Sequence, residues 1–319
     1  MMRRLAMAAL VTIAVISSSY AATSHARMLR MLAEMDTVKL FFGGGFVSTV
    51  SIGRSSLGQH IPLVIIHDHN VPIESTARMF VICRQHGNEP ASTEAMLGVI
   101  RSYFSQTNNC DKDLLKKVTI LIVPMMNPDG SLRNKRRNAN GADLNRDWLA
   151  QSQPETRAVA GAIRKWQPDL IIDAHELDEN DHQRDFIECI GIRSGADPVL
   201  ISKSVEMQKL ISAKLLTYGI KAAAKSARYR TPPRLAHRYY SQKRGTMAIL
   251  VETRQSGRRA YNCKERARIH MITAMTAARY LAGNKDKIRQ EIAQWWNGRS
   301  KPGFAYRGGY KRNSGKKGQ

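Results

Sequence analysis

Short apolar runs alternate with longer amphipathic segments along most of the chain. The runs are rich in Val, Ile and Leu and predict β-strands at 47–52, 61–66, 79–83, 118–123, 170–172 and 247–251. The amphipathic segments repeat apolar residues at helical spacing and predict helices at 28–35, 91–104, 154–165, 198–218 and 264–282. This alternation predicts a single α/β domain with a mixed, mostly parallel central sheet flanked by helices on both faces. Functional side chains are expected at the carboxyl ends of the strands.

The two ends of the chain differ in composition from this body. Two arginines precede a 12-residue apolar run at 5–16, which is too short to span a membrane and is typical of a secretory signal. Small residues follow this run, and cleavage is expected after Ala21 or Ala26. The last residues contain seven Lys and Arg and no acid, which predicts disorder. The predicted organisation is a signal peptide at 1–26, a connecting segment at 27–47, a folded domain at 48–298 and a basic disordered tail at 299–319.

The charge balance concerns partners rather than fold. Fifty Lys and Arg against 26 Asp and Glu give a net charge of +24, which favours an anionic partner. A signal peptide predicts an exported protein, periplasmic or secreted, with no transmembrane anchor after cleavage. No specific nucleic acid is therefore expected. The basic tail either binds an anionic envelope polymer or is a solvated terminus that keeps the protein soluble. The four cysteines allow up to two disulfides, although Cys83, inside an apolar run, is expected as a buried free thiol.

Two polar clusters that follow predicted strands contain metal-ligand residue types. His86 and Glu89 are three residues apart directly after the strand at 79–83, and His175 follows the strand at 170–172. A lone pair of this spacing is commonly a surface pair, and a lone histidine at a strand end is commonly structural. Together they supply two nitrogens and one carboxylate, which suits a catalytic zinc with a position left for water.

Three further segments carry polar groups with a chemical use. Asn-Pro-Asp-Gly at 127–130 indicates a turn, and residues 136–146 supply guanidinium and amide donors suited to a carboxylate. A basic surface loop is the alternative explanation. Glu252 ends the strand at 247–251, where a solvent-facing salt-bridge partner would be the ordinary explanation.

These motifs, in this order, resemble the zinc metallocarboxypeptidase family, of which carboxypeptidase A is a member. The resemblance covers roughly residues 48–282. It implies that the folded domain of this protein, which the signal peptide predicts to be exported, is a zinc-dependent peptidase with one Zn²⁺ per chain that hydrolyses C-terminal peptide or amide bonds. The resemblance further implies that His86, Glu89 and His175 bind the zinc and that Glu252 is the general base.

The same resemblance assigns roles to the residues around the metal. Arg136 corresponds to the arginine that polarises the scissile carbonyl, with Arg137 as a rival less favoured by spacing. Asn145 and Arg146 correspond to the pair that binds the terminal carboxylate of the substrate, and Asp143 to an acid that orients the first histidine.

Two departures from the family pattern affect substrate binding. Asp147 follows Arg146 where the family usually has asparagine, and its charge is expected to restrain Arg146. The tyrosine that closes over the substrate corresponds to Tyr229 by spacing, with Tyr239 and Tyr240 as rivals. The surrounding segment, 225–244, contains seven Lys and Arg and no acid, which predicts a basic specificity pocket or merely an exposed charged surface.

The expected substrate is a peptide with a free carboxylate. For an exported protein the abundant candidate is the peptidoglycan (murein) stem peptide, which is rich in carboxylates. Alternatives are a general peptide-scavenging carboxypeptidase, a deacylase of the succinylglutamate desuccinylase or aspartoacylase type, and a non-catalytic wall- or polyanion-binding protein on this fold.

Overall fold

An eight-stranded mixed sheet forms the centre of the molecule. The computed structural model describes residues 22–42, 45–106, 110–177, 185–190, 196–227, 233–243, 246–255 and 261–297. The strands are β1 (Val47–Arg54), β2 (His60–Ile66), β3 (Ala77–Cys83), β4 (Val118–Val123), β5 (Leu170–Glu176), β6 (Phe186–Ile190), β7 (Ala223–Ala227) and β8 (Met247–Thr253). Their order in the sheet is β1-β2-β4-β3-β5-β8-β6-β7. The central strands β4, β3, β5 and β8 are parallel, whereas β1, β2 and β6 join through antiparallel pairs.

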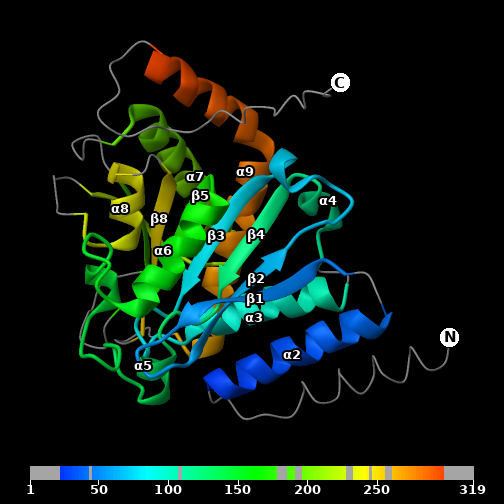
Figure 1. Cartoon of the computed structure of the whole chain (residues 1–319). Helices are drawn as coiled ribbons and strands as arrows, with labels where there is room; N and C mark the ends of the chain where they lie inside the picture. Colours follow the sequence, from blue (N-terminus) through cyan, green and yellow to red (C-terminus); the bar gives the residue numbers. More distant parts are fainter. Residues whose placement is uncertain are drawn as a thin grey trace, which may run out of the picture.

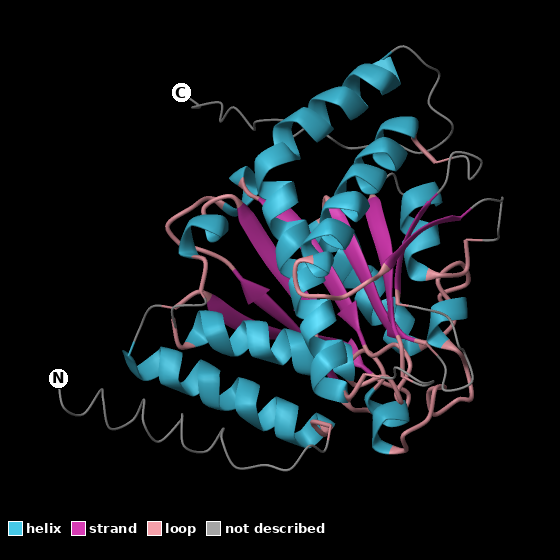
Figure 2. Ribbon diagram, turned by 180° about the vertical axis from the view of Figure 1, so that it is seen from behind, coloured by secondary structure: helices cyan, strands magenta, loops and turns pink. Residues whose placement is uncertain are grey.

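Helices cover both faces of this sheet. They are α2 (His25–Phe42), α3 (Ala91–Phe104), α4 (Lys112–Leu115), α5 (Pro128–Leu132), α6 (Pro154–Trp166), α7 (Pro198–Leu216), α8 (Ala236–Lys243) and α9 (Cys263–Asn297), with 3-10 turns at Ile73–Ser75 and Leu144–Arg146. One apolar core lies between the sheet and α3, α7 and α9, and the other lies beneath α6 and α8 (Figures 1 and 2). Helix α2 lies beside α3 and contributes Met28 and Leu32 to the first core.

The predicted fold class is confirmed, and most predicted elements lie within a few residues of the observed ones. Strand β5 is longer than predicted, because Asp173–Glu176 continue its pairing with β8 beyond the apolar run. Strands β6 and β7 were not predicted: β7 reads Ala-Ala-Lys-Ser-Ala, a sequence without strand preference, and it forms by pairing with β6. Helix α9 extends past the predicted end at 282.

All four cysteines of the chain are free thiols. Cys83 is a buried free thiol as expected, and Cys110, Cys189 and Cys263 are also free.

Most of the predicted signal peptide and the predicted basic tail lie outside the described residues, so the division of the chain remains a prediction. Among the described helices, none is long and apolar enough to cross a bilayer.

The first described residues are anchored to the folded domain. The backbone N–H and the hydroxyl of Thr23 both donate to the Glu94 carboxylate on α3, at 2.6 and 3.0 Å. Arg84, which follows β3 with a left-handed φ of 54°, donates to the carbonyl of Thr23 and to that of Gly87. The segment before α2 therefore supports the loop that begins at Arg84. Cleavage after Ala21 would retain these contacts of Thr23, whereas cleavage after Ala26 would remove them.

Candidate metal centre and active site

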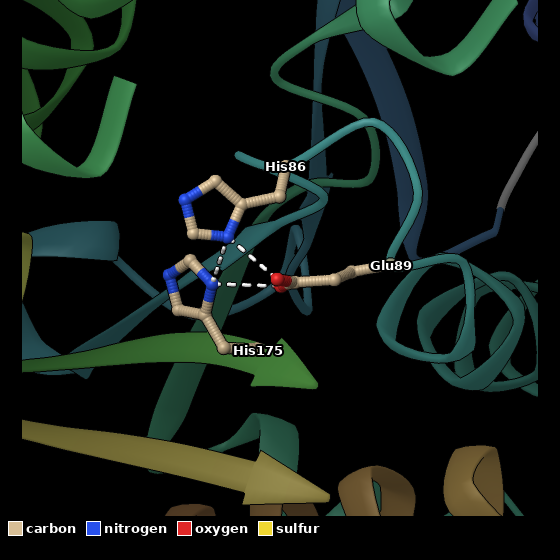
Figure 3. Close-up of side chains that lie close together, drawn as sticks. All are labelled: His86, Glu89 and His175. Carbon is tan, nitrogen blue, oxygen red and sulfur yellow. Dashed lines mark hydrogen bonds and ion pairs between the residues drawn. The ribbon is translucent and has the colours of Figure 1, made fainter. Parts of the chain in front are cut away.

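Three side chains from two segments converge at the carboxyl ends of the central strands. His86 and Glu89 lie in the loop between β3 and α3, and His175 lies near the end of β5 (Figure 3). The Nδ1 atom of His86 is 2.6 Å from Glu89 Oε1, and the Nδ1 atom of His175 is 2.8 Å from Glu89 Oε2. The two Nδ1 atoms are 3.1 Å apart, and all three residues are buried. The predicted convergence of these three side chains is therefore present.

The chemistry of this donor set fits zinc. Two imidazole nitrogens and one carboxylate oxygen, all within 4.8 Å of one another, match the three-ligand pattern of catalytic zinc sites. Burial alone would raise the pKa of Glu89, but His86 and His175 lower that pKa well below its ordinary value. The carboxylate is thus held ionised, as a metal ligand must be.

A close backbone contact positions the ligand loop. Asn127 donates from Nδ2 to the carbonyls of Gln85 and Arg136, and its Oδ1 accepts from the Gly130 N–H at the start of α5. Gly87 packs directly on this turn: a Cβ there would lie 2.0 Å from the Gly130 carbonyl carbon. The Asn-Pro-Asp-Gly turn therefore joins the metal-ligand loop to the segment that carries Arg136.

Each histidine contacts a carboxylate through the ring nitrogen that faces away from the ligand cluster. His86 Nε2 is 2.9 Å from Asp143 Oδ1, and His175 Nε2 is 2.8 Å from Asp173 Oδ1. Such contacts fix the tautomer and orientation of a metal-binding imidazole. Sequence reasoning included Asp143 but missed Asp173, although a residue two positions before His175 in a strand shares its face.

The structure distinguishes the two candidate arginines. Arg136 Nε is 3.2 Å from Asp143 Oδ2 and its Nη1 is 3.5 Å from Glu89 Oε1, with 35% of its side chain exposed. Arg137 is exposed and donates to the carbonyl of Gly141. Arg136 therefore lies at the ligand cluster, and Arg137 points to its own loop.

Glu252 lies next to the ligand cluster through strand pairing. Parallel β5 and β8 place Glu252 opposite His175, and the Glu252 side chain is half-buried. Its Oε2 atom is buried without a hydrogen-bond partner among the described residues. Burial raises the pKa of Glu252 to about 8, with further increases from Glu89 and Asp173 and opposing effects from His175 and Arg136. A carboxyl group with a perturbed pKa beside a metal-ligand cluster is typical of an acid–base residue.

The residues expected to bind a substrate carboxylate differ in accessibility. Arg146 is exposed, and its Nη1 donates to the carbonyl of Asn145. The Asn145 amide is buried: Oδ1 accepts from Ala236 N, and Nδ2 lies 2.9 Å from His175 Nε2. Asp147 was expected to restrain Arg146, but its carboxylate accepts from the backbone N–H and the hydroxyl of Ser152 and from the backbone N–H of residue 153.

The region expected to form the specificity pocket is less basic than its sequence suggests. Strand β6, which was not predicted, brings Glu188 within 2.7 Å of Arg238 Nη2. Lys225 Nζ lies 3.5 Å from the centre of the Phe186 ring, and Arg234 is exposed. Several other basic residues of this segment lie outside the described residues. The charge of Arg238 is therefore paired with that of Glu188, and the expected basic specificity pocket stays a prediction.

Two of the three candidate tyrosines are structural. Tyr239 and Tyr240 are buried beneath the sheet in the core with α6, and the Tyr240 ring packs edge-on against Trp148. Tyr229 lies outside the described residues, so its role stays a prediction.

The model of the family described as "Zinc carboxypeptidase" matches residues 43–180, the segment that carries all three candidate ligands. This segment of the chain is similar to the zinc carboxypeptidases. The family-level prediction is thereby confirmed, and zinc is the metal that the family uses. Glu252 and α8 lie beyond the matched segment, so their placement at the site comes from the structure.

Relatives and solved structures of the same class extend the comparison. "Carboxypeptidase 2" of Trichophyton rubrum is 26% identical over 204 residues, which are 61% of this chain and 36% of that protein. The carboxypeptidase N catalytic chain of Homo sapiens is 31% identical over 159 residues, 36% of this chain and 34% of that one. The chain thus spans about a third of the length of these curated relatives. A metallo-carboxypeptidase from Pseudomonas aeruginosa, solved with (2-guanidinoethylmercapto)succinic acid, shares the fold with a TM-score of 0.64 and 24% identity over 84% of this chain and 70% of that one.

Proposed function

We propose that this protein is a zinc-dependent carboxypeptidase that hydrolyses the C-terminal peptide or amide bond of its substrate. The observation that carries the proposal is the convergence of His86, Glu89 and His175 with Glu252 on the adjacent strand. The family match includes the ligands, and the pairing of β5 with β8, which sets Glu252 opposite His175, supports Glu252 as the acid–base residue.

Hydrolysis requires an activated water, a group that transfers its proton and a group that stabilises the developing negative charge. Zinc bound by this set would lower the pKa of a water to about 7 and polarise a carbonyl. Glu252 takes the proton from the attacking water and passes it to the leaving amine, a role that suits a partly buried carboxyl group without a hydrogen-bond partner on Oε2. Arg136 presents its guanidinium beside Glu89 and stabilises the negative charge that develops on the carbonyl oxygen.

Restriction to chain ends comes from an exposed guanidinium. Arg146 follows Asn145 on the 3-10 turn behind Asp143, and its exposed side chain can pair with a terminal carboxylate. Asn145 is buried, so we assign it a secondary part in that contact. Tyr229 is proposed to close over the substrate. The Pseudomonas aeruginosa structure, which holds a succinic acid derivative, supports a site of this class that accepts carboxylates.

We further propose that the protein is exported to the periplasm or the medium and that its substrate is a murein stem peptide. The apolar run at 5–16 supports export, and the net charge of +24 would attract the protein to an anionic wall polymer. Stem peptides carry several carboxylates, so they match an exposed arginine better than a neutral peptide does. The basic tail is proposed to hold the protein near the wall.

One experiment separates these alternatives. The purified zinc-loaded protein is incubated with murein stem peptides, with ordinary peptides and with N-acyl amino acids, and the products are identified by mass; the Glu252→Gln variant is the matched control. Faster release from stem peptides supports the proposal. Equal release from ordinary peptides indicates a scavenging carboxypeptidase, release from N-acyl amino acids alone indicates a deacylase, and no release from any substrate overturns the enzymatic role.

A further inference from the structure

A row of buried polar side chains leads from the metal ligand His175 away from the ligand cluster. Asp173 Oδ1 contacts His175 Nε2 at 2.8 Å, and Asp173 Oδ2 lies 3.2 Å from His237 Nδ1. The opposite nitrogen of His237, Nε2, lies 3.1 Å from Glu188 Oε1, which also contacts Arg238 Nη2 at 2.7 Å. These residues come from β5, α8 and β6, so the row crosses three elements.

His237 is the central member of this row and is fully buried, at 0% exposure. Each of its ring nitrogens faces a carboxylate oxygen, and its backbone N–H also faces Asp173 Oδ2 at 3.4 Å. A buried carboxylate needs a partner on each oxygen, because an unpaired buried acceptor carries a large desolvation cost. His237 therefore engages the one oxygen of Asp173 that His175 does not use.

The other oxygen of Asp173 is fixed equally well. The Gln85 side-chain amide donates to Asp173 Oδ1, and Gln85 Oε1 in turn accepts from the Trp148 indole N–H at 2.7 Å. With both oxygens held, the Asp173 carboxylate has a fixed plane. That plane sets the direction of the His175 Nε2 contact and hence the direction in which His175 Nδ1 points.

We propose that His237 is a positioning residue for the metal centre, which acts through Asp173 to orient the ligand His175. The proposal rests on the proposed zinc function and adds to it a fully buried residue that is linked to the ligand His175 through Asp173. Loss of partners of this kind typically lowers metal affinity about 10- to 100-fold.

The same contacts link α8 to the metal. His237 is the second residue of α8, and the N–H of Ala236, the first, donates to Asn145 Oδ1. Asn145 Nδ2 in turn lies 2.9 Å from His175 Nε2. Because His175 Nε2 carries the proton that it donates to Asp173, the Asn145 amide nitrogen only packs against it, and the link from α8 to the ring runs through Asp173. Metal binding and the docking of α8 should therefore stabilise each other.

A pair of substitutions separates positioning from simple packing. In His237→Asn the amide nitrogen takes the place of Nδ1 and can still donate to Asp173. In His237→Gln the amide nitrogen takes the place of Nε2 and can donate only to Glu188. Each variant loses one ring-nitrogen contact, and asparagine is one methylene smaller than glutamine, so His237→Asn should lower the free energy of unfolding of the metal-free protein at least as much as His237→Gln does.

The decisive measurement is zinc affinity by competition with a chromogenic chelator. We expect His237→Gln to bind zinc about 10- to 100-fold more weakly than wild type and His237→Asn to stay within about threefold. His67→Gln is a control, because His67 is a buried histidine that contacts Thr119 far along the sheet; it should lower stability without changing zinc affinity.

Several outcomes overturn the proposal. Equal zinc affinities for the Asn and Gln variants exclude positioning through Asp173. Should neither variant fold, Asp173→Asn provides the test, and zinc affinity at the wild-type level in that variant refutes the proposal. A wild-type protein that binds no zinc overturns the proposed function as well, whereas a zinc-binding wild type with unaffected variants overturns only the role of His237.

Discussion

Replacement of Glu252 by Gln removes a proton-binding group while keeping its size. In the folded, metal-free protein the pKa of Glu252 is raised to about 8, above its ordinary value of 4.5, chiefly by burial. Between these two values the folded state holds a proton that the unfolded state has released. The free energy of unfolding of the wild type therefore falls as pH rises through this window.

The size of this effect follows from the shift. At roughly 1.4 kcal/mol per pKa unit, the upper limit is about 5 kcal/mol, and the partial exposure of the side chain reduces it to on the order of 2–3 kcal/mol. The Gln variant has no carboxyl group to ionise, so its free energy of unfolding does not fall in this pH window for this reason. We expect the metal-free variant to match the wild type near pH 4.5 and to exceed its stability by about 2–3 kcal/mol above pH 8.

Urea unfolding of both metal-stripped proteins at pH 5 and pH 9 measures the difference. The variant should exceed the wild type in free energy of unfolding by more at pH 9 than at pH 5. An equal difference at the two pH values refutes the argument that the surroundings of Glu252 disfavour its ionised form. In the zinc-loaded variant, kcat should fall about 10²- to 10⁴-fold with one zinc retained, because the change removes a base but no ligand. Near-wild-type activity with confirmed metal content would contradict the role as general base.

Three further predictions concern the ligand loop and its supports. Gly87→Ala places a Cβ 2.0 Å from the Gly130 carbonyl carbon, so we expect a loss of about 1–3 kcal/mol in urea unfolding and weaker zinc binding in chelator competition; unchanged values for both would show that the contact can relax. Arg136→Ala should lower kcat/KM about 10²- to 10³-fold with zinc content unchanged, whereas Arg137→Ala, whose guanidinium faces its own loop, should remain near wild type; equal losses in the two variants would rule out the assignment. Thr23→Val removes a hydroxyl that donates to a carboxylate on α3 and should cost about 1 kcal/mol in urea unfolding, with no change expected if this segment is loosely held.

Local features of the sequence determined the fold class and the ligand set. The central strands are buried on both faces, so their apolar runs are visible without any knowledge of their partners. His86 and Glu89 share one short loop directly after such a strand, and His175 lies near the end of another. Because parallel strands end at the same edge of the sheet, these positions alone predicted that the side chains meet.

Tertiary structure decided what depends on side-chain direction and on pairing between distant segments. Arg136 and Arg137 are neighbours in sequence, and only the folded loop shows which guanidinium reaches Glu89. Strand β6 pairs with β8 and lies beside the start of α8, which is how Glu188 comes to neutralise Arg238. The contact of His237 with Asp173 joins residues 64 positions apart. No local pattern encodes such contacts, because their energy comes from burial that exists only after the sheet and α8 have packed together.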